Sequence, residues 1–178
     1  MPQAEKIGFL LQTYVRPRQK QVAVYGIGKL DNGETFGFVD RRIKPRFYIY
    51  SEDLSRANMH LTSSDISIKD SQRVTMQGEP VIQVETEGTH VLKQAVTTLA
   101  ENGISTFEGD IPLAKRYLIE HDCHGPVRIN GDWQPGQEVD WTVINPELTP
   151  CDWEPELAIL SIDIETNREA TLVTAISS

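Results

Sequence analysis

The feature that most constrains the fold is a pair of strand-like runs, residues 22–30 and 34–39, joined by Asp31-Asn32-Gly33. Asn-Gly is the strongest short-range signal for a β-hairpin, because both residues tolerate the positive φ of a type I′ turn. Other strand-like runs span residues 7–14, 46–50, 73–76 and 81–85. The last two are separated by Gly78-Glu79-Pro80, which predicts a second hairpin. The first half of the chain is therefore expected to be rich in β-structure.

Three helices are expected among these strands. Residues 52–60 predict a short helix with Ser51 as its N-cap. From Thr89 onward apolar residues recur at helical spacing until Gly103, which predicts an amphipathic helix. Together with residues 81–85 and 104–108 this helix forms a strand–helix–strand unit. A third helix is expected to run to about residue 122, with Asp110 as its cap and Pro112 in its first turn.

Length and composition exclude several classes of protein. The chain has 178 residues, enough for one domain or for one domain and the start of another. No uncharged apolar run approaches the length of a membrane span, and the N-terminal residues lack the features of a signal peptide. Two cysteines exclude a disulfide framework, so a reducing cytoplasm is the expected compartment.

Charge is distributed unevenly along the chain. The net charge is −9, yet residues 1–50 carry nine Lys and Arg against four Asp and Glu. Within this basic stretch four cations are interleaved with three aromatic residues, the first of which is Phe38, and together they predict contact with phosphates and bases of a single strand. An equally open interpretation is a solvated strand edge that charge protects against aggregation. The candidate nucleic-acid-binding residues are Arg41, Arg42, Lys44, Arg46, Phe47 and Tyr48.

A Pro-rich acidic stretch predicts a domain boundary near the C-terminal end. Two short strands are expected at residues 127–129 and 141–144, and three prolines and three acidic residues follow them. The expected division is a domain over residues 1–145, a connector over 146–156 and a second unit over 157–178.

Two carboxylates follow the connector on a strongly β-like run, residues 157–166. Asp163 and Glu165 are two residues apart, so on a strand they project from one face while Ile162 and Ile164 are buried on the other. Two carboxylates on one face repel each other unless a cation, a proton or a basic partner relieves the repulsion, and hard divalent ions prefer oxygen ligands. The pair therefore predicts a Mg²⁺ or Mn²⁺ site suited to attack of water on a phosphodiester. The alternative is an exposed acidic sheet edge.

Three blocks of sequence resemble family B DNA polymerases. Ser161-Ile-Asp-Ile-Glu-Thr166 is similar to their first exonuclease motif, and Asp110-Ile-Pro-Leu-Ala-Lys-Arg-Tyr-Leu-Ile119 to a helix placed shortly before it. Lys44-Pro-Arg-Phe-Tyr-Ile49 resembles an early aromatic strand, and Gly8–Leu11 matches the opening strand of the bacterial polymerase II group within the family. The resemblance covers the whole chain, and the order and spacing of the blocks agree.

The resemblance implies an N-terminal piece of a longer enzyme of mixed α/β (α+β) class. A β-rich N-terminal domain with a small strand–helix–strand layer would precede the first strands of an RNase H-like exonuclease domain, with residues 171–177 as its second strand. The parent would copy a DNA template from dNTPs and proofread its primer 3′ end with a 3′–5′ exonuclease. It would serve replication or repair at the bacterial nucleoid, with a sliding clamp as a possible partner through regions that this chain lacks.

The same resemblance assigns roles to single residues. Asp163 would bridge two catalytic metals and Glu165 would bind the metal beside the nucleophile. Their partner carboxylates are not in this sequence, so the chain by itself is expected to be inactive and to hold no metal. A template-base pocket that reads uracil in archaeal relatives maps to Pro45, Pro80, Gln83, Ile111 and Pro112. Gln83 replaces a small apolar residue there, which argues against uracil sensing.

Other interpretations remain. A zinc site could be imagined at His121, Cys123, His124 and Cys151, but the spacing matches no standard finger. The chain could instead be a non-catalytic single-stranded nucleic-acid binding module, or an interaction domain whose acidic half meets a partner. A terminal hairpin that stands alone exposes its edges, which predicts self-association at high concentration.

Overall fold

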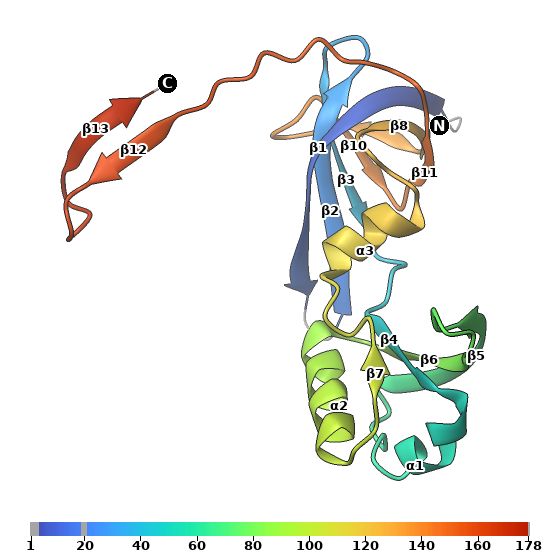
Figure 1. Ribbon diagram of the computed structural model, residues 1–178. Coiled ribbons are helices and arrows are strands. Elements are labelled where there is room, and N and C mark those ends of the chain that lie inside the picture. The colour runs from blue at the N-terminus through green and yellow to red at the C-terminus, as the bar shows by residue number, and fades with distance from the viewer. Residues whose placement is uncertain (1–3, 19–20, 178) are drawn as a thin grey trace.

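A computed structural model describes residues 4–18 and 21–177 of the chain. Its strands form a seven-stranded sheet, a four-stranded sheet and a two-stranded hairpin that stands apart from both (Figure 1). Helices pack beside the two larger sheets. This arrangement confirms the predicted mixed α+β class with a strand-rich N-terminal region.

The seven-stranded sheet has the order β11-β8-β1-β2-β3-β10-β9. Its strands are β1 (Ala4–Arg18), β2 (Gln21–Leu30), β3 (Thr35–Asp40), β8 (Pro126–Gly131), β9 (Trp133–Pro135), β10 (Trp141–Ile144) and β11 (Glu147–Pro150). Only Asp132 separates β8 from β9, although β8 lies near one end of the sheet and β9 forms the other. The sheet must therefore curl so that β9 returns close to β8 and β1, and Trp133 Nε1 donates a 2.8 Å hydrogen bond to the Ala4 carbonyl on β1. We call this unit the barrel.

The barrel encloses the first hydrophobic core. Alternate residues of β2 and β3 point inward, among them Val24, Phe36 and Phe38. Helix α3 (Leu113–Glu120) closes one end by burying Leu113 and Tyr117, and the Tyr117 ring stacks on Phe38 at 5.6 Å between centroids. The start of α3 differs from the prediction. The helix begins after Pro112, and Asp110 makes no capping hydrogen bond.

The four-stranded sheet has the order β5-β6-β4-β7 and holds the second core. Its elements are β4 (Arg46–Tyr50), a 3-10 turn (Ser51–Asp53), α1 (Leu54–Asn58), β5 (Ile66–Val74), β6 (Pro80–Thr86), α2 (Thr89–Glu101) and β7 (Thr106–Phe107). The predicted strand–helix–strand unit is present as β6-α2-β7, with β4 inserted between its two strands. The expected Ser51 cap is absent, since the Ser51 side chain makes no capping hydrogen bond.

Both predicted hairpins exist, but the predicted type I′ turn is wrong. Gly33 has a φ of 89°, whereas Asn32 is not among the residues with positive φ in the described chain. Gly33 N donates to Leu30 O and Leu30 N donates to Glu34 O, which is a type I turn followed by a left-handed glycine. The turn at Gly78 (φ 88°) repeats this pattern.

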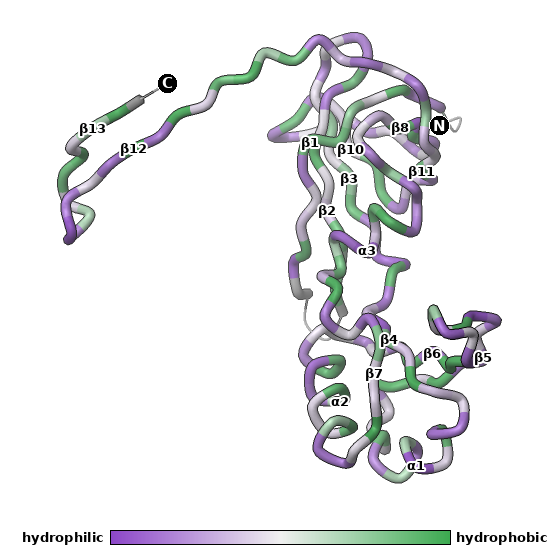
Figure 2. Tube along the Cα trace, in the orientation of Figure 1, coloured by the Kyte–Doolittle hydropathy of each residue, from purple (hydrophilic) through white to green (hydrophobic). Residues whose placement is uncertain are grey.

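The C-terminal hairpin consists of β12 (Asp163–Thr166) and β13 (Val173–Ser177). An extended segment leads to it from the barrel, and Figure 2 shows hydrophobic residues along that segment and in the hairpin itself. The expected strand over 157–166 is confined to its last four residues. The predicted burial of Ile162 and Ile164 is wrong, because these side chains are 57% and 53% exposed with neither larger sheet packed on them.

Candidate nucleic-acid interface

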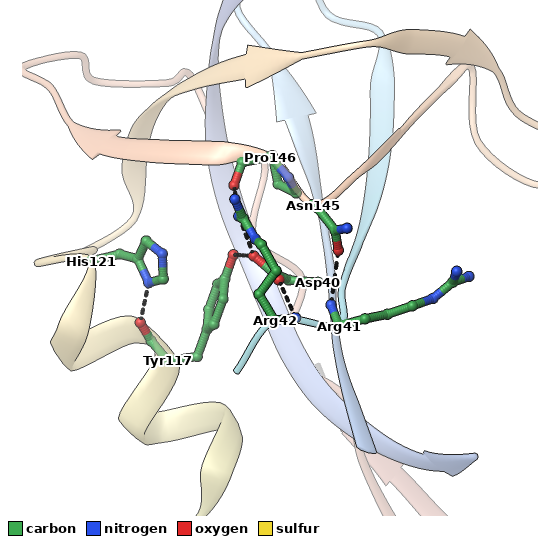
Figure 3. A network of polar contacts seen from close by, with 7 residues as sticks. All are labelled: Asp40, Arg41, Arg42, Tyr117, His121, Asn145 and Pro146. Atoms are coloured by element: carbon green, nitrogen blue, oxygen red, sulfur yellow. Dashed lines mark hydrogen bonds and ion pairs between the residues drawn. The ribbon is translucent and has the colours of Figure 1, made fainter. Parts of the chain in front are cut away.

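The basic segment is largely neutralised by carboxylates of the fold. Arg42 pairs with Asp40 at 2.6 Å and Lys44 pairs with Glu87 at 2.5 Å. Arg46 pairs with Glu120 on α3. Arg41 is the member of the segment that has no ion pair within the described chain. Its backbone N–H donates to Asn145 Oδ1 at 2.9 Å, and its side chain extends away from the other residues in Figure 3. Arg41 is therefore the cation of this segment that is free to meet a phosphate.

Asp40 organises the polar network at the end of β3 (Figure 3). Its carboxylate is 2% exposed and accepts hydrogen bonds from Arg42 Nε and Nη2 and from the Tyr117 hydroxyl. Arg42 Nη2 also donates to the Pro146 carbonyl at 2.5 Å. Burial acts to raise the pKa of Asp40, but the hydrogen bonds and charge of Arg42 and the Tyr117 hydroxyl hold this pKa below its usual value. The network ties β3, α3 and the loop before β11 together.

The lowered pKa of Asp40 predicts a loss of stability in acid. The contribution is complete above the unfolded aspartate pKa of about 3.9 and disappears as pH falls through the lower folded value. We expect Asp40→Asn to cost about 1.5 kcal/mol at neutral pH, because Arg42 is half exposed and its hydrogen bonds are partly screened. Urea unfolding between pH 7 and pH 3 should show a shallower acid decline for this variant. An Asp152→Asn control should keep the wild-type profile, and a wild-type profile for Asp40→Asn would contradict the assignment.

Phe47 and Tyr48 are core residues and present no ring to solvent. Phe47 is fully buried and Tyr48 is 2% exposed. The Tyr48 hydroxyl donates to Gln83 Oε1 at 3.3 Å, and the Arg73 guanidinium lies 5.6 Å from the Tyr48 ring centroid. Phe47, Tyr48 and Ile49 are buried in succession and point to alternating sides, so both faces of β4 are covered. In this structure neither ring can stack on a base as the sequence pattern suggested.

Three of the five candidate base-pocket residues surround one cavity. Pro45, Ile111 and Pro112 line a space of about 620 Å³ together with residues of α2 and α3. Gln83 and Pro80 do not line this cavity. Gln83 instead donates from Nε2 to Glu85 Oε1 at 2.8 Å, and Pro80 is the exposed first residue of β6. The structure thus brings Pro45, Ile111 and Pro112 together around one cavity and leaves Pro80 and Gln83 outside it.

The two predicted metal ligands lie on β12. Asp163 pairs with Ser177 and Glu165 with Ala175 in the β12–β13 ladder, and both carboxylates are exposed. Asp163 Oδ1 accepts a hydrogen bond from the Ile164 backbone at 3.0 Å. Within the described residues no three His, Cys, Asp or Glu side chains gather as a metal site. The pair supplies oxygen ligands of the kind Mg²⁺ prefers, but only part of a coordination shell.

The zinc alternative finds no support in the described residues. His124 Nε2 lies 2.9 Å from Asp122 Oδ1, and His121 Nδ1 lies 2.8 Å from the Tyr117 carbonyl. Cys123 is buried, and burial raises the pKa of its thiol to about 11, which disfavours the thiolate that zinc requires. These residues belong to the end of α3 and its exit turn.

One aromatic–basic cluster was not found from the sequence. Tyr14 on β1 and Tyr25 on β2 stack with ring centroids 5.4 Å apart, and the Arg16 guanidinium lies over both rings. Their pairing depends on the register of two strands, with Tyr14 opposite Tyr25. The signal in the sequence is an aromatic residue at an outward position of each predicted strand.

Comparison with known proteins relates the chain to DNA polymerases. It is 27% identical over 172 residues to DNA polymerase II of Escherichia coli, a match that covers 96% of this chain and 19% of that protein. Its fold matches the family B DNA polymerase of the archaeon Pyrobaculum calidifontis with a TM-score of 0.64 and 18% identity, over 89% of this chain and 22% of that one. No protein-family profile matches. The resemblance to family B DNA polymerases is confirmed, and the chain spans about a fifth of the length of these relatives. In the described residues no helix is long and apolar enough to cross a membrane.

Proposed function

We propose that this chain is the N-terminal region of a cytoplasmic DNA polymerase of family B, similar to polymerase II, that copies DNA and proofreads with a 3′–5′ exonuclease. The observation that carries the proposal is the similarity to DNA polymerase II along 96% of the chain. The barrel and the four-stranded sheet would form the N-terminal domain, residues 1–145. The hairpin after the connector, over 157–178, would start the exonuclease domain. β11 lies within the connector expected over 146–156 and pairs with β8, so the barrel extends to Pro150.

In this proposal Asp163 and Glu165 are catalytic only in the longer parent. A Mg²⁺ or Mn²⁺ ion would supply the charge that activates water and stabilises the leaving oxygen. The two carboxylates would hold part of its coordination shell, and other carboxylates of the parent would complete it. Template and primer DNA, dNTPs and a sliding clamp would be partners of the parent. The chain alone would be inactive, and its exposed hairpin would promote self-association.

The proposal predicts the behaviour of a chimera in which this chain replaces the corresponding region of E. coli DNA polymerase II. The chimera should extend a primer on a template and degrade a primer 3′ end. Asp163→Ala with Glu165→Ala should reduce the exonuclease rate on the order of 100-fold or more, because it removes charge that positions the metal, and should leave primer extension intact.

The matched control is Asp152→Ala with Glu156→Ala, which also removes two exposed carboxylates. It should leave both activities unchanged. A chimera without primer extension, or one whose exonuclease tolerates loss of Asp163 and Glu165, would reject the proposal. A second candidate function, a non-catalytic single-strand binding module, is favoured by the free Arg41 and would be supported if the chimera failed but the chain bound single-stranded DNA.

A further inference from the structure

The outer face of the barrel carries a row of aromatic and aliphatic side chains. Strand register places Tyr14 opposite Tyr25, Tyr25 opposite Val39, and Val39 opposite Ile144. The row thus crosses β1, β2, β3 and β10. Ile144 is 48% exposed, and Tyr14, Tyr25 and Val39 are partly exposed. An apolar row on the solvent side of a barrel is a candidate binding surface.

A hollow lies beside this row because one position of the face has no side chain. Gly37 is two residues before Val39 on β3, on the same face, and lies opposite Ile27 of β2. The loop between β9 and β10 forms the opposite wall of the hollow. The resulting pocket has a volume of about 480 Å³ and is bordered by Tyr14 and Tyr25. Glu138 is the one carboxylate that lines it.

Cations without carboxylate partners flank the same face. The Arg16 guanidinium lies 5.2 Å from the Tyr14 centroid and 5.7 Å from that of Tyr25. In the strand register Arg16 lies opposite Ala23, and Val24 lies opposite Asp40. Arg41 follows Asp40 in the chain, so it lies at the same end of the strands as Arg16. Lys29 lies at the other end. Within the described chain none of these three cations forms an ion pair, in contrast to Arg42, Lys44 and Arg46.

We propose that this outer barrel face binds single-stranded nucleic acid, with one base against the Tyr14–Tyr25 stack and adjacent phosphates on Arg16 and Arg41. Stacked aromatic rings beside unpaired cations are the two components that sequence-tolerant single-strand binders combine. Charge selects the occupant, because three cations without ion pairs on this face attract an anionic strand locally, although the net charge of the chain is −9. The inference rests on the proposed function only for the source of the strand, which would be the polymerase template.

The test is fluorescence anisotropy of the 178-residue chain with labelled oligothymidylate of about 16 nucleotides, a length at the upper end of single-module sites. Tyr14→Leu should weaken binding about 10-fold, within the range for loss of one base stack. Arg16→Gln should reduce the slope of log K against log salt by about 0.7, the value for one phosphate contact on a single strand. Ile144→Glu should weaken binding at least as much as Tyr14→Leu, because it places a charge on the face.

Two control variants match these changes elsewhere. Met76→Glu adds the same charge at a fully exposed apolar residue of the β5–β6 turn, and Lys44→Gln removes a cation that Glu87 already neutralises. Both control variants should bind like wild type. Thermal unfolding of every variant should show that the fold is kept. Controls that weaken binding as much as the face variants, or face variants that bind like wild type, would overturn the proposal.

Failure of this inference differs from failure of the proposed function. If the wild-type chain does not bind the oligonucleotide while the polymerase chimera extends primers, the face is not a strand-binding site but the proposed function stands. If the face variants bind normally and instead destroy primer extension, the face docks another protein domain, which also overturns the inference. Loss of primer extension in the unmutated chimera concerns the proposed function alone.

Discussion

Phe47→Ala is expected to lower the free energy of unfolding by about 3–5 kcal/mol, the range for removal of a buried aromatic ring. The Phe47 ring is fully buried in the second core, where its neighbours include Ile49, Val84 and Leu99. Strands β6 and β7 fix β4 on both sides, so the backbone has little freedom to collapse into the space that the ring leaves. Urea unfolding followed by circular dichroism measures the effect.

Phe107→Ala is the matched control for Phe47→Ala. Phe107 lies on β7 opposite Tyr48, is partly exposed, and packs edge-on against Tyr50 at 4.8 Å between centroids. Its removal should cost about 1–2 kcal/mol less than removal of Phe47, because less surface is buried and solvent can fill the gap. A Phe47→Ala variant that kept its stability and lost affinity for single-stranded DNA would restore the base-stacking interpretation.

The strand that contains Phe47 could be predicted from the sequence, but the burial of the Phe47 ring could not. Strand position follows from local pattern, and β4 was predicted over its full length. Burial of three consecutive residues, Phe47, Tyr48 and Ile49, cannot follow from alternation, because it depends on which distant elements cover each face. The short strands β9 and β11 escaped prediction for a related reason. Their few residues become strands only through pairing with β10 and β8.

The candidate site likewise contains some residues that local pattern places and others whose partners lie far away in the chain. Asp163 and Glu165 are two residues apart, so local pattern suffices to place them on one strand. The ion pairs of Arg46 with Glu120 and of Lys44 with Glu87 join distant parts of the chain, and the sequence shows the cations without their partners. The Tyr14–Tyr25 stack also depends on register, which a bulge in β1 between Leu10 and Gln12 shifts by one residue. A bulge of this kind leaves no reliable mark in sequence.

Gly28→Ala should destabilise the barrel by about 3 kcal/mol, the upper end of the usual cost of overpacking. A Cβ atom at Gly28 would lie 2.2 Å from the Phe9 carbonyl oxygen and 2.6 Å from Phe36 Cε1. The carbonyl belongs to the backbone of β1 beside the bulge and cannot rotate away like a side chain. The methyl group can be accommodated only if β1 and β2 separate, which weakens the longest ladder in the sheet. Urea unfolding and hydrogen exchange of β1 amides measure both consequences.

Gly37→Ala provides the comparison that isolates the backbone contact. It adds the same methyl group to the next strand, where the nearest atom, Val139 Cγ2, is 3.5 Å away at ordinary contact distance. Its effect should stay within about 0.5 kcal/mol, because the new side chain fits and the unfolded chain loses some conformational freedom. Equal destabilisation by the two variants would mean that strand glycines matter here for flexibility. A large loss confined to Gly28→Ala would mean that close approach of β1 and β2 requires glycine at that position.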